Sequence, residues 1–181
     1  VKRFEQAWAT RCHCIYGIGV GNGMDAIEIG LRALEIGPGD EVITTSMTAF
    51  ATVLAIIRCG ATPVLADIRA DTAHLDMDSV ERCLSPKTKA VLLVHLYGQI
   101  ADMTAWQAFC SRHKIALLED CAQAHLAEWN DKPAGSFGSF GAYSFYPTKN
   151  LGTIGDAGII VSNDAILAEK SASLRNYGQS V

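Results

Sequence analysis

The sequence lacks the features that mark membrane-spanning and nucleic-acid-binding proteins. Its 181 residues include 15 Lys and Arg against 19 Asp and Glu, which gives a net charge of −4. Without a basic surplus, a nucleic acid or an anionic membrane is not the expected partner. The longest apolar runs have the length of a strand, so we expect no transmembrane span and no signal peptide. We also find no internal repeat, low-complexity tract or linker.

Cysteine is present, but its spacing is not that of a metal site. The six cysteines are scattered through apolar segments, and Cys12-His13-Cys14 is the only cluster. This cluster is a poor zinc template because no second pair of ligands accompanies it. We therefore expect no metal, and reduced thiols in a cytoplasmic protein.

The alternation of apolar segments predicts one α/β domain. A hydrophobic content of 49% is enough to bury a core. Helices are expected over residues 2–10, 51–58 and 164–176 and from Asp25, Asp76 and Asp102; strands are expected over residues 14–20, 41–45, 63–66, 90–96, 115–118, 142–145 and 158–161. Apolar strands separated by helices indicate a three-layer α/β/α structure with a mostly parallel sheet covered on both faces.

A glycine turn at residues 21–25 leads from the first strand into a helix. In such sheets, ligands bind at the carboxyl ends of the strands. The exposed N–H groups and the dipole of the helix favour an anion there, typically a phosphate. The helix begins too soon for a G-x-G-x-x-G dinucleotide fingerprint, and no Walker lysine follows. A tight turn that needs glycine for steric reasons alone is the alternative.

An acidic pair, Glu119-Asp120, ends an apolar strand. An acid in this place either caps a helix or directs its charge into a site. A carboxylate can keep a pyridine nitrogen protonated, which pyridoxal phosphate needs in order to act as an electron sink. Without further evidence the helix cap would be favoured.

The stretch 144–152 places Lys149 in an apolar and glycine-rich neighbourhood, after an aromatic run. Burial disfavours the charged form of a lysine, and Schiff-base chemistry with a carbonyl needs the neutral amine. The alternative is a surface lysine in a loop. The glycine turn, Asp120 and Lys149 are all expected at one edge of the sheet, so together they favour a pyridoxal phosphate site.

The chain as a whole resembles the DegT/StrS-type nucleotide-sugar aminotransferases, which are fold-type-I pyridoxal-phosphate enzymes. The resemblance runs nearly end to end, and the interval between Asp120 and Lys149 also fits. It is carried by ordered motifs at residues 20–26, 37–43, 60–64, 94–98, 119–125, 144–149 and 155–158. Family members usually have a further N-terminal segment and a smaller C-terminal domain. The resemblance therefore implies that residues 1–181 are a pyridoxal-phosphate-binding large domain, a fragment in which those two parts are absent.

The resemblance also implies roles for individual residues. Lys149 would form the Schiff base with the cofactor and then move a proton as general base, and Asp120 would pair with the pyridine nitrogen. Gln123 would lie near the ring, close to its phenolic oxygen or its face. Ser144 would donate its hydroxyl to the phosphate. Further phosphate contacts would come from the backbone around Gly23, Met24 and Asp25.

The sequence departs from the family pattern at several positions near these residues. Met24 stands where many relatives carry Thr or Ser, so a hydroxyl for the phosphate is missing. Ala49 stands where an aromatic often stacks on the ring. Leu126 and Ala157 replace glycines. These departures affect the shape of the pocket and its affinity for the cofactor rather than the chemistry.

The activity implied is transfer of an amino group, commonly from glutamate, to a keto sugar linked to a nucleoside diphosphate. Relatives in which the lysine is replaced perform dehydration, so Lys149 favours transamination. The family acts as homodimers whose active sites take residues from both subunits. Two alternatives are a non-catalytic relative that keeps the fold and the cofactor, and a nucleotide- or NAD-binding α/β domain that does not depend on Lys149.

Overall fold

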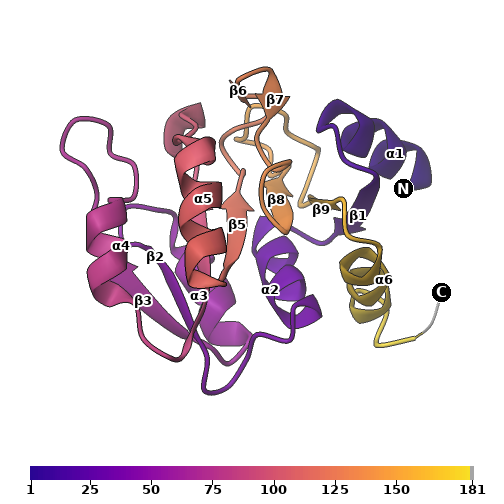
Figure 1. The fold of residues 1–181 in the computed structure, drawn as a ribbon. Coiled ribbons are helices and arrows are strands. Elements are labelled where there is room, and N and C mark those ends of the chain that lie inside the picture. The colour runs from indigo at the N-terminus through magenta and orange to yellow at the C-terminus, as the bar shows by residue number, and fades with distance from the viewer. Residues whose placement is uncertain (180–181) are drawn as a thin grey trace.

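A seven-stranded sheet forms the middle layer of the computed structural model, which describes residues 1–179 (Figure 1). The strands are β1 (Tyr16–Val20), β2 (Glu41–Thr45), β3 (Thr62–Ala66), β4 (Thr88–Val94), β5 (Ala116–Asp120), β8 (Phe140–Ser144) and β9 (Gly158–Ser162). Their order across the sheet is β1-β9-β8-β5-β4-β2-β3. Neighbours from β8 to β3 pair in parallel, whereas β9 is antiparallel to both β1 and β8. The prediction of a mostly parallel sheet is confirmed.

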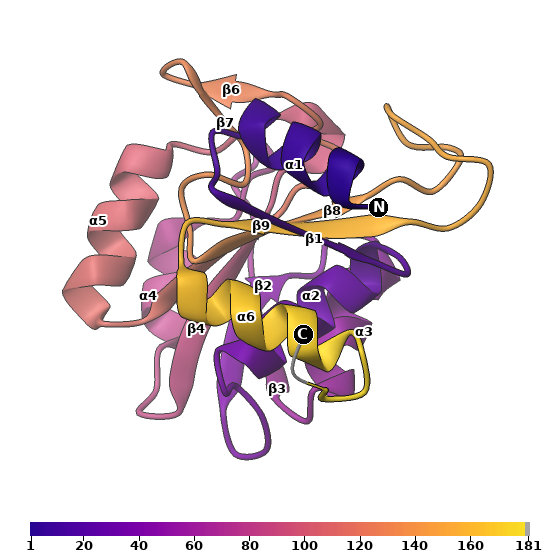
Figure 2. The same cartoon turned by 90° about the vertical axis from the view of Figure 1, so that its right-hand side faces the viewer.

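Helices cover both faces of this sheet. They are α1 (Lys2–Arg11), α2 (Gly23–Ala33), α3 (Phe50–Arg58), α4 (Met77–Cys83), α5 (Met103–His113) and α6 (Ala165–Leu174). Figure 2 shows α4 and α5 on one side of the strands and α2 and α3 on the other. The predicted three-layer α/β/α arrangement is therefore confirmed. No helix within residues 1–179 is both long enough and apolar enough to cross a membrane.

Alternation along the central strands divides the core between the two faces. In β4, Ala90 and Leu92 pack toward α2 and α3, whereas Val91 and Leu93 pack toward α4 and α5. Both sets are buried, which is why the strand reads as an uninterrupted apolar run. The same alternation in β5 places the side chains of Asp120 and Glu119 on opposite faces of the sheet.

Capping side chains fix where several helices begin. Asp76 accepts a hydrogen bond from the N–H of Ser79, as the sequence predicts, and Asp102, near which a helix was expected to start, accepts one from the N–H of Ala105. The helix expected from Asp25 begins earlier, at Gly23. Asn22 is its cap, because the side-chain oxygen of Asn22 accepts the Asp25 N–H at 2.8 Å.

Two small elements were not expected. A single 3₁₀ turn, η1 (Leu96–Gly98), follows β4, and a hairpin of β6 (Glu128–Trp129) and β7 (Lys132–Pro133) precedes β8. Strands of two residues are too short to show a periodic pattern, so the sequence carries no usable signal for the hairpin.

Candidate active site

A cavity of about 310 Å³ opens where the carboxyl ends of β1, β5 and β8 meet. Its walls come from the starts of α2 and α3, the end of β5, and the end of β8 with the loop after it. Of the residues singled out in the sequence, it brings together Gly23, Met24, Asp120, Ser144 and Lys149. Asp25 and Gln123 lie outside the cavity wall.

The start of α2 forms one end of this cavity. The Asp25 N–H is used by the Asn22 cap, and the Asp25 carboxylate accepts a hydrogen bond from the Asn22 side chain at 3.0 Å. The N–H groups of Gly23 and Met24 belong to the first turn of the helix, where no intrahelical acceptor exists. Asp25 thus stabilises the turn. The N–H groups of Gly23 and Met24 are the ones available to bind an anion.

A glycine is needed at position 23 also because the backbone there lies very close to Ser144. A Cβ on Gly23 would lie 2.6 Å from the Cβ of Ser144, which is closer than two such atoms can stand. The steric explanation for this glycine is therefore correct. It does not exclude the anion, because the same contact brings the Ser144 side chain beside the first turn of α2.

Asp120 provides a buried carboxylate at the base of the cavity. Its Oδ2 accepts a hydrogen bond from the Thr52 hydroxyl at 2.7 Å, and its Oδ1 accepts the Ala122 N–H at 3.0 Å. Burial raises the pKa of Asp120, although both hydrogen bonds and the charge of Lys149 oppose this shift. Turns rather than a helix follow at residues 121–127, so the helix-cap alternative is wrong.

Lys149 lines the cavity from the loop that follows β8. Its backbone N–H donates to the Tyr146 carbonyl at 2.8 Å, which closes a turn. The expectation of a buried lysine is wrong in degree, because Lys149 is only partly buried. The reason is that the loop leaves the sheet edge, and large side chains on it, such as Leu151 and Ile154, are exposed.

Gln123 and His125 make hydrogen bonds to backbone groups of segments near the cavity. The Oε1 of Gln123 accepts the N–H of Tyr97 at 2.9 Å. Tyr97 adopts a left-handed conformation with φ 58°, and the residue is 76% exposed. The Nε2–H of His125 donates to the Ser144 carbonyl at 2.9 Å and so ties the loop after β5 to the end of β8.

Several residues that line the cavity were given no role from the sequence, among them Asn22, Thr52, Tyr146 and Asp156. Asn22 had a usable signal, because an Asn before an apolar helical pattern is a common cap. Thr52 had none, because its place beside Asp120 depends on how α3 packs against the end of β5.

Glu119, on the opposite face of the sheet, belongs to a separate buried network. Within residues 1–179, His95, Glu119 and Cys121 form a group whose ligand atoms all lie within 4.8 Å of one another, the geometry of a possible metal site. However, donors of the chain already occupy the carboxylate of Glu119. It accepts the N–H groups of Gly135, Phe137 and Gly138 and a hydrogen bond from His95 Nε2.

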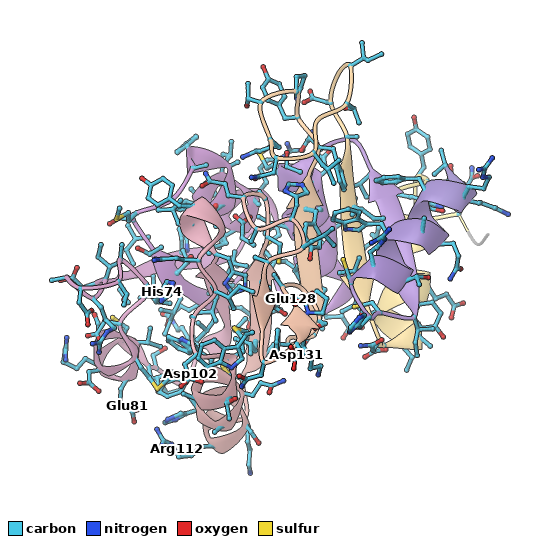
Figure 3. The ribbon with its side chains drawn as sticks, turned by 90° about the horizontal axis from the view of Figure 1, so that it is seen from above. His74, Glu81, Asp102, Arg112, Glu128 and Asp131 are labelled. Atoms are coloured by element: carbon cyan, nitrogen blue, oxygen red, sulfur yellow. The ribbon has the colours of Figure 1, made fainter. Side chains whose placement is uncertain are left out.

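A second hollow, of about 470 Å³, lies on the α4–α5 side of the sheet. Figure 3 labels two of the residues that line it, His74 and Asp102. Asp102 is engaged as the cap of α5, and burial lowers the pKa of His74. None of the residues proposed from the sequence to bind the cofactor lies in its wall.

The fold matches that of solved pyridoxal-phosphate-dependent aminotransferases over nearly the whole chain. The chain belongs to the DegT/DnrJ/EryC1/StrS aminotransferase family, whose model matches residues 1–181. The resemblance found in the sequence motifs is thereby confirmed. Aminotransferases of this family depend on pyridoxal phosphate.

Among curated proteins, the chain is 50% identical to a pleiotropic regulatory protein of Geobacillus stearothermophilus, over 98% of this chain and 48% of that protein. It is 47% identical to the dTDP-3-amino-3,4,6-trideoxy-alpha-D-glucose transaminase of Streptomyces venezuelae, over 98% of this chain and 47% of the transaminase. The crystal structure of S. venezuelae DesV in complex with a ketimine intermediate has a TM-score of 0.95 at 46% identity. That alignment covers 98% of this chain and 48% of DesV. The chain thus spans about half the length of the curated relatives it matches.

Proposed function

We propose that residues 1–181 form the cofactor-binding large domain of a pyridoxal 5′-phosphate-dependent aminotransferase that acts on a nucleotide-linked keto sugar. The observation that carries the proposal is that Asp120 and Lys149 line one cavity together with the first turn of α2. The dTDP-sugar transaminase among the relatives supports the class of substrate. Glutamate is proposed as the amino donor.

The groups around the cavity fit this cofactor. A volume of about 310 Å³ lies at the lower end of the range for small-molecule sites. The first-turn N–H groups of α2 and the Ser144 hydroxyl suit a phosphate. Asp120 is a buried carboxylate whose raised pKa shows that its charge lacks full compensation, so it suits a cationic ring nitrogen.

Each residue then has a distinct task. The bound cofactor supplies a carbonyl that reacts with amines and a ring that accepts electrons. Asp120 holds a proton on the ring nitrogen. The Nζ of Lys149 would be the nucleophile that holds the cofactor and the base that moves a proton in the site. The phosphate is bound by Gly23, Met24 and Ser144. Asp25 stabilises the turn through its hydrogen bonds with Asn22.

Gln123 is assigned to the neighbourhood of the phenolic oxygen. Its Oε1 is engaged by the Tyr97 N–H, so the amide NH₂ is the end left to meet that oxygen. Tyr97 and Gln123 thus act as a pair, with the left-handed backbone of Tyr97 orienting the amide.

We further propose a homodimer in the cytoplasm. Large apolar side chains are exposed on the segments that line the cavity or lie next to them. These are Phe50, Tyr97, Tyr146, Leu151 and Ile154. An exposed apolar group of this kind around a site is typical of a subunit interface. The free thiols of all six cysteines fit a reducing compartment.

Borohydride trapping with pyridoxal phosphate, followed by peptide mass mapping, tests the proposal. We expect a reduced adduct on Lys149 that disappears in Lys149→Ala. Lys132→Ala, a change of an exposed lysine in the β6–β7 hairpin, should keep the adduct. A folded protein without an adduct on Lys149 would contradict the proposal. An adduct without amine transfer from glutamate to a nucleotide-linked keto sugar would identify a non-catalytic relative.

A further inference from the structure

The side chain of Thr52 is hydrogen-bonded to Asp120, the proposed partner of the ring nitrogen of the cofactor. It occupies the first turn of α3 and is 1% exposed. Its hydroxyl oxygen is 2.7 Å from Asp120 Oδ2 and 2.7 Å from the hydroxyl oxygen of Thr48. A short chain of two hydroxyl groups therefore runs from the partly buried Thr48 to the fully buried end of β5.

The direction of the hydrogens in this chain depends on the charge of Asp120. An ionised carboxylate only accepts, so Thr52 must donate its one hydrogen to Oδ2. The oxygen of Thr52 is then free to accept from Thr48. A protonated Asp120 would remove the need for this donor. The arrangement is therefore matched to the charged form of Asp120.

Two donors on separate segments fix the orientation of the carboxylate. Thr52 approaches Oδ2 from α3, and the Ala122 N–H approaches Oδ1 from the loop after β5. The backbone of Asp120 is also held, since its carbonyl accepts the His95 N–H. A β-branched side chain such as that of Thr52 has few rotamers, so its hydroxyl is already oriented before a ligand binds.

We propose that Thr52 is a positioning residue that keeps Asp120 ionised and oriented toward the ring nitrogen of the cofactor. The inference rests on the proposed function, because it takes Asp120 as the partner of that nitrogen. Thr52 acts through Asp120 and needs no contact of its own with the cofactor. Its contribution should therefore depend on whether the bound ring carries a nitrogen.

The test compares two ligands and two variants of the full-length protein. Thr52→Val keeps the shape and removes the hydroxyl, and Thr52→Ser keeps the hydroxyl. The ligands are pyridoxal phosphate and its deaza analogue, in which a C–H group replaces the ring nitrogen. Dissociation constants are measured by equilibrium binding, so the readout does not depend on turnover.

We expect Thr52→Val to weaken binding of pyridoxal phosphate about tenfold, because Asp120 is then less well oriented and less favoured as the anion that pairs with the ring nitrogen. Binding of the deaza analogue should change by less than about twofold, because Asp120 has no ring nitrogen to hold there. Thr52→Ser should restore the affinity for pyridoxal phosphate. Thr52→Ala makes the same test if valine does not pack in this position.

Thr44→Val is the matched control. Thr44 is another fully buried threonine, and its hydroxyl donates to the Leu92 carbonyl at 2.9 Å rather than to a site residue. This variant should leave the affinity for both ligands unchanged.

Equal losses for the two ligands in Thr52→Val would overturn the inference, because they would mean a general packing defect. An unchanged affinity for pyridoxal phosphate would overturn it as well. In both cases the proposed function would stand. A wild-type protein that binds neither ligand would instead overturn the proposed function and the inference with it.

Discussion

Gly23 and Ser144 approach each other so closely that a Cβ on the glycine would lie 2.6 Å from the Cβ of the serine. The start of α2 and the end of β8 are therefore in contact, although they are far apart in the sequence. The contact places N–H groups of a first helical turn beside a hydroxyl, which is a favourable arrangement for a phosphate. Any side chain at position 23 would separate the two.

Gly23→Ala should weaken binding of pyridoxal phosphate at least about tenfold and destabilise the fold by about 1–3 kcal/mol, the usual cost of overpacking. Binding titration and urea unfolding measure the two effects. Gly37→Ala is the control, since a Cβ there would meet its nearest neighbour, the Cys59 carbonyl, at an ordinary 3.5 Å. A Gly23→Ala protein with normal affinity would show that the close approach is not needed for binding.

Asp120→Asn should make the cofactor-free protein more stable. Burial raises the pKa of Asp120 above its ordinary value of 3.8, so the folded state disfavours the ionised carboxylate at neutral pH. An amide accepts the Ala122 N–H in the same way, and the Thr52 hydroxyl can turn to accept from its NH₂. We therefore expect the variant without cofactor to have a higher free energy of unfolding than the wild type.

The same substitution should abolish most of the stabilisation that pyridoxal phosphate gives to the wild-type protein, because the ring nitrogen loses its charged partner. Urea unfolding with and without the cofactor measures both changes. A loss of stability in the cofactor-free variant would mean that the attraction of Lys149 outweighs the cost of burial.

Glu119→Gln should destabilise the fold by about 3 kcal/mol, because a buried donor then faces other donors. An NH₂ group at the position of Oε2 would meet the Gly135 N–H, which now donates there at 2.7 Å. His95 can change its tautomer to accept, but a backbone N–H cannot. Denaturant unfolding gives the size of the loss.

Glu128→Gln is the matched control for Glu119, because Glu128 is exposed on β6. It should change the stability by less than about 0.5 kcal/mol. If the two variants were equally stable, the network around Glu119 would not stabilise the loop at residues 135–138.

The free energy of unfolding should fall as the pH drops below 6.5, which is the ordinary pKa of a histidine side chain. Burial lowers the pKa of His125, so the unfolded chain takes up the proton first. The loss of stability due to His125 is therefore absent above pH 6.5. It grows as the pH falls toward the pKa of His125 in the folded state. Burial lowers the pKa of His74 too, which adds to the same trend.

His125→Gln tests this origin. The glutamine amide can still donate to the Ser144 carbonyl, but it does not titrate. Unfolding free energies measured from neutral to mildly acidic pH should show a shallower slope than in the wild type, with the part due to His74 remaining. Identical slopes would assign the pH dependence to other groups.

Most of the fold was predictable because its signals are local. The short strand expected over residues 41–45 is β2 with the same bounds, and Asp76 and Asp102 cap the helices they were expected to start. The direction of β9 was not predictable. It depends on the path of the loop after β8, and no periodicity within β9 distinguishes an antiparallel strand from a parallel one.

The candidate site was predictable where the residue type itself carries the chemistry. Lys149, Asp120 and Gly23 stand out as a lysine, an acid and a glycine at strand ends, and the cavity contains all three. The burial of Lys149 was overestimated because sequence neighbours do not show that a loop leaves the sheet. Thr52 was missed because its role comes from the packing of α3 against β5.

The pairing of β1 with β9 sets an order for synthesis and folding. β1 leaves the ribosome about 140 residues before the strand it pairs with, and within residues 1–179 it pairs with no other strand. At ~5–20 residues per second, synthesis of that stretch takes roughly 7–30 seconds, during which β1 stays unpaired. The turn after β1 is thus made well before the strand that pairs with β1, and the cavity at the end of β1 is complete only once β9 has emerged.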